Sequence, residues 1–62
     1  MTPEYDFDIL WKAWYKINNM PYENKNMCYN IFRKLNCNDR QLAIKNVCVG
    51  NSLFEYLRNH LK

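Results

Sequence analysis

The sequence of 62 residues has very little glycine and proline, with one Gly and two Pro. An all-β domain needs such residues in the turns between its strands, so their scarcity argues against a β fold. No run approaches the roughly 18 consecutive apolar residues of a membrane span. The opening residues 1–6 are acidic, whereas a secretory signal peptide begins with basic residues and an apolar run. We therefore expect no membrane partner and a location in a reducing cytoplasm.

Cysteine is sparse and poorly spaced for its two common structural uses. Cys28, Cys37 and Cys48 are odd in number, whereas secreted disulfide scaffolds prefer an even and denser set. Zinc sites usually pair ligands at separations of about two to four residues, and no such pair occurs here. A zinc site built from the three cysteines and His60 is the remaining alternative. We expect instead that Cys28 and Cys48 are small core residues, that His60 lies at a helix end, and that the chain holds no metal and no cofactor.

Residues for catalysis are also lacking. The sequence has no Ser-His-Asp or Cys-His arrangement in a recognisable context, and no glycine-rich loop that could hold a phosphate. Asp6 and Asp8 are two positions apart, which places them on different sides of a helix. A helical chain of this size also has little room for a cleft that excludes water. We therefore expect that the protein is not an enzyme.

Apolar residues, by contrast, are abundant, at 48% hydrophobic and 16% aromatic. A chain this short has one core and marginal stability. Apolar positions recur at helical spacing in four stretches separated by breaks at 18–21, near 36 and around Gly50. The sequence thus predicts an all-α fold, a compact bundle of three to four short helices in a single domain spanning 1–62.

The helix boundaries follow from capping residues. Thr2, Pro3 and Glu4 favour a helix start, and the apolar spacing extends this first helix to about Asn18. Asn36 is expected to end the second helix in the left-handed conformation. Asn38 with Gln41, and Ser52 with Glu55, are typical of capping boxes that start the third and fourth helices. The predicted core positions are Phe7, Leu10, Trp11, Trp14, Ile17, Cys28, Ile31, Phe32, Leu35, Leu42, Ile44, Val47, Cys48, Phe54, Leu57 and Leu61.

The sequence resembles one small helical module. Residues 7–16, FDILWKAWYK, are similar to the F-x-x-F-W-K-x-Y-P-K-K opening of a module at the carboxyl ends of phage and prophage replication proteins, including replisome organisers and helicase loaders. The similarity continues at Lys25, Cys28, Phe32 and Leu35, at 38–40, and at 56–59, while the module's proline is Tyr15 and its closing tryptophan is Leu61. The resemblance implies a phage-type protein that acts near DNA replication in the host cytoplasm, without chemistry of its own.

Two functional classes remain open. In the first, the chain binds a larger host or viral protein of the replication, transcription or defence machinery, as an adaptor or inhibitor, through Ile9, Ala13, Tyr22, Tyr29 and Arg33. In the second, it is an accessory nucleic-acid-binding module with weak, non-specific phosphate contacts from Lys12, Lys16, Arg33, Lys34, Arg40 and Lys45. The net charge is only +3, and no recognition-helix signature occurs, so we favour protein binding. Ile9 and Ala13 form an apolar stripe on the first helix. A homodimer formed through this stripe could not be distinguished in sequence from binding to a larger protein.

Overall fold

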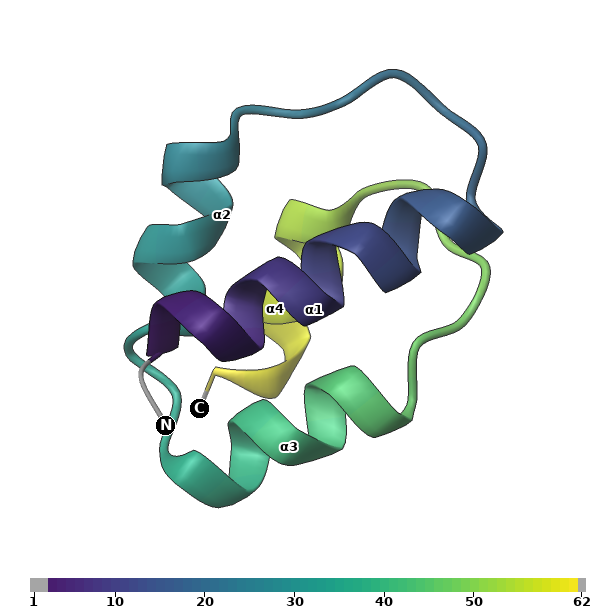
Figure 1. Cartoon of the computed structure of the whole chain (residues 1–62). Helices are drawn as coiled ribbons and strands as arrows, with labels where there is room; N and C mark the ends of the chain where they lie inside the picture. The colour runs from purple at the N-terminus through teal and green to yellow at the C-terminus, as the bar shows by residue number, and fades with distance from the viewer. Residues whose placement is uncertain (1–2, 62) are drawn as a thin grey trace.

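Four helices make up the computed structural model, which describes residues 3–61 (Figure 1). They are α1 (Pro3–Ile17), α2 (Lys25–Phe32), α3 (Cys37–Lys45) and α4 (Leu53–His60). The described part contains no strand, which confirms the predicted all-α bundle. None of the helices within 3–61 has the length and apolar character needed to cross a membrane.

The helices form two packed pairs that share one core. The long α1 packs mainly against α3, and α2 packs mainly against α4, while α1 also contacts α2. The 18–24 segment is not helical and links the end of α1 to the start of α2 across the top of Figure 1. This segment therefore lies over the outside of the bundle, and its side chains form part of the surface described below.

The core contains ten buried apolar side chains drawn from all four helices and the turn after α2. They are Phe7, Leu10, Trp14, Cys28, Ile31, Phe32, Leu35, Ala43, Leu53 and Leu57. The predicted face of the second helix, Cys28 to Leu35, is buried in full and is confirmed. Spacing alone predicts that face correctly because these positions all lie within one stripe of a helix.

Other core predictions are wrong. Trp11 is half-buried against the core rather than inside it, and Cys48 is exposed in the loop after α3. Leu42 is 40% exposed, and the buried residue of α3 is its neighbour Ala43. Apolar spacing did not reveal this position, because alanine is small and is not among the large apolar residues that define the spacing. The fourth helix buries Leu53, whereas Leu61, just after its end, is 40% exposed. Ile17, also predicted for the core, is 48% exposed.

The helix starts use side-chain caps. Ser52 accepts a hydrogen bond from the backbone N–H of Glu55 and caps α4, as predicted. The cap of α3 is Asn36 rather than Asn38, since the Asn36 side chain accepts from Asp39 N at 2.8 Å. Asn36 has φ −72°, so it begins α3 and does not end α2 in a left-handed conformation. Pro3 is the first residue of α1, and the predicted cap Thr2 lies outside the described residues.

The end of α1 is tied to the loop that precedes α4. The buried Asn18 donates from Nδ2 to the carbonyl oxygens of Trp14 at 3.1 Å and Cys48 at 3.2 Å. Its Oδ1 accepts a hydrogen bond from Gly50 N at 2.7 Å. Gly50 therefore holds the loop against α1 and does not terminate α3, which ends at Lys45.

Candidate functional site

Three aromatic side chains on one side of the bundle contact one another at the surface, and we call Trp11, Tyr15 and Tyr22 the aromatic face. The rings of Trp11 and Tyr22 are stacked, with centroids 5.8 Å apart and an interplanar angle of 18°. Tyr15 meets Tyr22 edge-on at 4.7 Å and 70°. Tyr22 is nevertheless 73% exposed. A large ring is thus held in place by other rings while most of its surface faces solvent.

The local sequence explains why these rings meet. Trp11 and Tyr15 are four residues apart, so both lie on one flank of α1. The 18–24 segment then passes this flank, because the Tyr15 hydroxyl donates to Glu23 Oε2 at 3.0 Å and accepts from Glu23 N at 3.0 Å. Burial, more than any other cause, raises the pKa of Tyr15 to about 12, so its hydroxyl keeps the proton that it donates. Fixing residue 23 in this way also places Tyr22 on Trp11.

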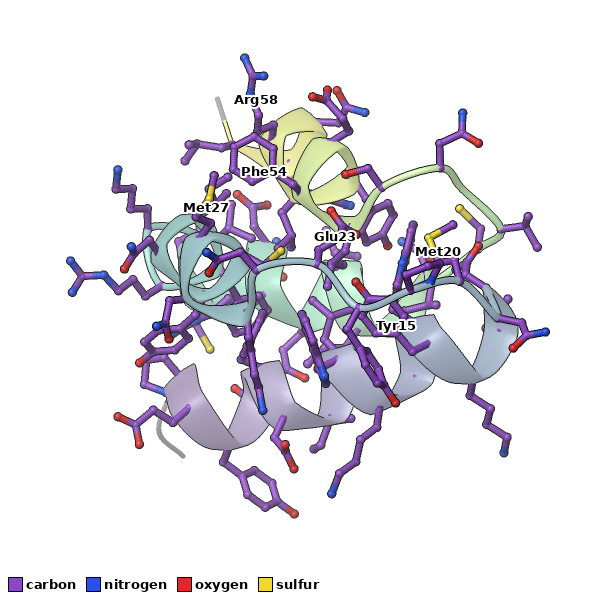
Figure 2. The ribbon with its side chains drawn as sticks, turned by 90° about the horizontal axis from the view of Figure 1, so that it is seen from above. Tyr15, Met20, Glu23, Met27, Phe54 and Arg58 are labelled. Atoms are coloured by element: carbon purple, nitrogen blue, oxygen red, sulfur yellow. The ribbon has the colours of Figure 1, made fainter. Side chains whose placement is uncertain are left out.

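Glu23 joins the aromatic face to the start of α4. Its carboxylate accepts hydrogen bonds from Ser52 Oγ at 2.7 Å, Leu53 N at 2.6 Å and Phe54 N at 3.3 Å. Figure 2 shows Glu23 between Tyr15 on α1 and the helix that carries Phe54. Burial acts to raise the pKa of Glu23, but these hydrogen bonds outweigh burial and leave the pKa below its usual value. The carboxylate is therefore a structural anchor and is not poised as a general acid or base near neutral pH.

The charges beside the aromatic face compensate one another. Asp8 pairs with Lys12 at 3.0 Å and with Lys25 at 3.8 Å, and the hydrogen bond from Lys12 is the main cause that lowers the pKa of Asp8. Lys25 Nζ also lies 5.5 Å from the centre of the Trp11 ring. An open hollow of about 290 Å³ adjoins these residues and is lined by Glu4, Phe7, Asp8, Lys25, Asn26 and Tyr29. The surface is therefore aromatic with nearly balanced charge.

The residues predicted to bind a partner separate into two groups. Tyr22 belongs to the aromatic face, and the half-buried Tyr29 lines the adjoining hollow with its ring 5.4 Å from that of Phe7. Arg33 is exposed just beyond the end of α2. Ile9 and Ala13 each lie two positions from the aromatic residues of α1, which places them on its opposite flank. The structure thus places Tyr22 against Trp11 and Tyr29 against Phe7, whose rings contact each other, and leaves the Ile9–Ala13 stripe elsewhere.

The residues predicted to contact phosphates do not form one surface. Lys16 and Lys45 lie in the last turns of α1 and α3, whereas Arg33 and Lys34 follow α2. Figure 1 shows the carboxyl-terminal ends of α1 and α3 on one side of the molecule and that of α2 on the other. Lys12 is paired with Asp8 as described above. Arg40 is half-buried, and its Nε is a buried atom without a hydrogen-bond partner.

Sequence reasoning missed Trp11, Tyr15 and Lys25 as parts of the site. The available signal was the spacing of Trp11 and Tyr15, which marks a second aromatic flank on α1. Nothing in the spacing indicates that the 18–24 segment returns to this flank, so neither the Trp11–Tyr22 stack nor the position of Lys25 follows from the sequence.

A smaller apolar patch lies between α2 and α4. Met27 is 50% exposed and lines an open hollow of about 240 Å³ together with Phe54. The Arg58 guanidinium lies 5.8 Å from the centre of the Phe54 ring and pairs with Glu55 at 3.5 Å. Figure 2 shows the three labelled side chains Met27, Phe54 and Arg58 on the same side of the molecule.

No His, Cys, Asp and Glu side chains within residues 3–61 form a group that could hold a metal ion. Cys28 is buried, and burial raises its pKa to about 11, so its thiol is a poor nucleophile near neutral pH.

Comparison of the chain with protein-family models, with curated proteins and with solved structures finds no match.

Proposed function

We propose that this chain is a small non-enzymatic binding module that docks on a larger protein, as an adaptor or inhibitor, through the aromatic face. The observation that supports this most is Tyr22, which is 73% exposed and yet held against Trp11. Tyrosine and tryptophan are the side chains that most often dominate binding energy at protein interfaces. A ring that is already ordered also loses less conformational entropy on binding.

The charge pattern favours a protein over a nucleic acid as the partner. Lys25, which lies 5.5 Å from the centre of the Trp11 ring, and Lys12 both pair with Asp8. A phosphate backbone would have to approach this carboxylate to reach either lysine. The accessory nucleic-acid role would need a continuous basic surface, whereas the remaining cations lie at opposite ends of the bundle. The resemblance to the phage replication module supports a partner from the replication, transcription or defence machinery of the host or virus.

Affinity capture from cells of the source organism tests this proposal, followed by calorimetry with the purified partner. The baits are the wild-type chain, Tyr22→Ala and Val49→Ala. Val49 is 79% exposed and lies in the loop before α4. Val49→Ala is therefore the control, because it removes exposed apolar surface as Tyr22→Ala does, but outside the aromatic face. We expect Tyr22→Ala to weaken the captured complex by about tenfold or more, as loss of an interface anchor does, and Val49→Ala to leave it unchanged.

Two results would contradict the proposal. One is a partner that binds Tyr22→Ala as tightly as it binds the wild type. The other is a nucleic acid bound by the wild type at physiological salt more tightly than any protein partner. The salt dependence of the affinity distinguishes a nucleic-acid partner from a protein partner, because phosphate contacts weaken steeply between about 50 and 200 mM salt.

A further inference from the structure

Two hydrogen-bond donors of the aromatic face are unused. Within residues 3–61, neither Trp11 Nε1 nor the Tyr22 hydroxyl makes a hydrogen bond, and neither is a buried atom. The other tyrosines whose hydroxyls have partners behave differently, since Tyr15 bonds to Glu23 at 3.0 Å and Tyr56 to the carbonyl oxygen of Ala43 at 2.7 Å. The aromatic face therefore offers flat apolar rings together with two donors that form no hydrogen bond within residues 3–61.

This combination matches the chemistry of a polyproline II segment. Such a segment has no internal hydrogen bonds, so its carbonyl oxygens are free to accept from a ligand-binding surface. Its proline rings pack on aromatic side chains, and the preformed helix loses little entropy on binding. Asp8 pairs with both Lys12 and Lys25 and so reduces their charge, which suits an uncharged ligand over this part of the surface.

The chain itself already packs one side chain of a non-helical segment on these rings. The 18–24 segment is non-helical, contains Pro21 and lies against Trp11 and Tyr15 through Tyr22. Asn24, at its end, has φ −67° and ψ 108°, in the extended region. Tyr22 is 73% exposed, so the outer surface of its ring is open to an extended segment of another protein.

The hollow beside the aromatic face adds a preference for charge. Glu4 is exposed, lines this hollow and forms no ion pair within residues 3–61. Lys25 also lines the hollow but is paired with Asp8, so the Glu4 carboxylate is left to pair with a cationic side chain of the ligand. The complementary ligand is thus proline-rich with a basic residue at one end.

On the basis of the proposed function, we propose that the aromatic face binds a proline-rich polyproline II segment of the partner protein, with an Arg or Lys of that segment beside Glu4. Trp11 and Tyr22 supply the rings and the two donors. Glu4 supplies the carboxylate that selects the basic end.

Nuclear magnetic resonance of the ¹⁵N-labelled full chain tests this inference with a decaproline peptide that ends in arginine. The control is a Gly-Ser peptide of the same length that also ends in arginine. The proline peptide should shift the indole N–H signal of Trp11 saturably, while that of Trp14, which is 1% exposed, stays in place. Tyr22→Ala should weaken binding about tenfold or more, and Val49→Ala should not change it. Glu4→Gln should remove the preference for the arginine-ended peptide over decaproline alone.

Several outcomes would overturn the inference. These are no saturable shift at Trp11, equal shifts with the Gly-Ser peptide, or tighter binding of oligothymidylate at the same face. Competition separates this failure from that of the proposed function. A partner whose capture requires Tyr22 but which the proline peptide does not displace contradicts only the inference. A bound proline peptide without any Tyr22-dependent protein partner contradicts only the proposed function.

Discussion

Gly50 lies close to the core in the loop before α4. A Cβ atom at this position would lie 2.8 Å from Cη2 of Trp14, a separation that real Cβ contacts essentially never show. Trp14 is 1% exposed, so a methyl group at residue 50 would have to displace either the buried ring or the loop. Gly50 does not have a positive φ, so the need for glycine here comes from this close approach rather than from the backbone conformation.

Gly50→Ala should therefore lower the free energy of unfolding by about 1–3 kcal/mol, as forced overpacking of a core does. Urea denaturation followed by circular dichroism measures the loss. Asn51→Ala, at the exposed neighbouring residue, is the control and should change stability by about 0.5 kcal/mol or less. Equal stability of Gly50→Ala and the wild type would show that the loop can move away from Trp14.

The two tryptophans show what single positions in the sequence can and cannot predict. Helical spacing assigned both Trp11 and Trp14 to the interior, yet only Trp14 is fully buried. Spacing gives the angle of a side chain around its helix, whereas burial depends on which neighbour covers that angle. Trp11 faces the side that α2 and the 18–24 segment cover only in part. For the same reason, Tyr22 and Tyr29 could be predicted as surface aromatics, but the contact between Tyr22 and Trp11 could not.

Among the elements, α4 depends most on a residue far away in the chain. It has eight residues, and an isolated helix of that length is marginal in water. Ser52 caps it locally, as the sequence predicts, and the Glu23 carboxylate accepts from Leu53 N and Phe54 N at the same end. A carboxylate at a helix start also interacts favourably with the helix dipole. This second cap could not be predicted, because it requires the 18–24 segment to lie beside α4.

Glu23→Gln should lower the free energy of unfolding near neutral pH by about 1–3 kcal/mol, because hydrogen bonds to an ionised carboxylate are stronger than those to an amide. The pKa of Glu23 is depressed in the folded protein, so its contribution is present above the ordinary value of 4.5 and is lost as the pH falls through the folded pKa. The gap between wild type and Glu23→Gln should therefore close as the pH falls well below 4.5.

Urea denaturation across this pH range measures the effect, with Glu55→Gln as the matched control. Glu55 is also in the first turn of α4 but is exposed, and its one ion pair within residues 3–61 is with Arg58 at 3.5 Å. Its variant should show a small loss, since exposed ion pairs contribute little. A Glu23→Gln variant that keeps the full pH dependence of the wild type would show that Glu23 does not anchor α4.

The whole molecule is a single core in which each helix has at least one buried side chain. The sequence predicted this architecture well. Each predicted helix has one apolar face, and four short helices can bury all of these faces together in only a few arrangements. It did not predict the polar ties, such as Asn18 to the loop before α4 and Glu23 to α4 itself. Each tie joins residues roughly thirty positions apart, and no local spacing rule covers such a distance.

A comparison of the two tryptophans tests whether the aromatic face can be removed without loss of the fold. Trp14→Ala should cost about 3–5 kcal/mol, which approaches the whole stability of a domain this small, so this variant should be unfolded or nearly so. Trp11→Ala removes a half-buried ring that contacts Tyr15 and Tyr22, so it should remain helical with a lower melting temperature. Circular dichroism melts of both variants measure these outcomes. Trp11→Ala should lose partner binding while folded, whereas an unfolded Trp11→Ala would mean that the aromatic face is part of the core and not a separate binding surface.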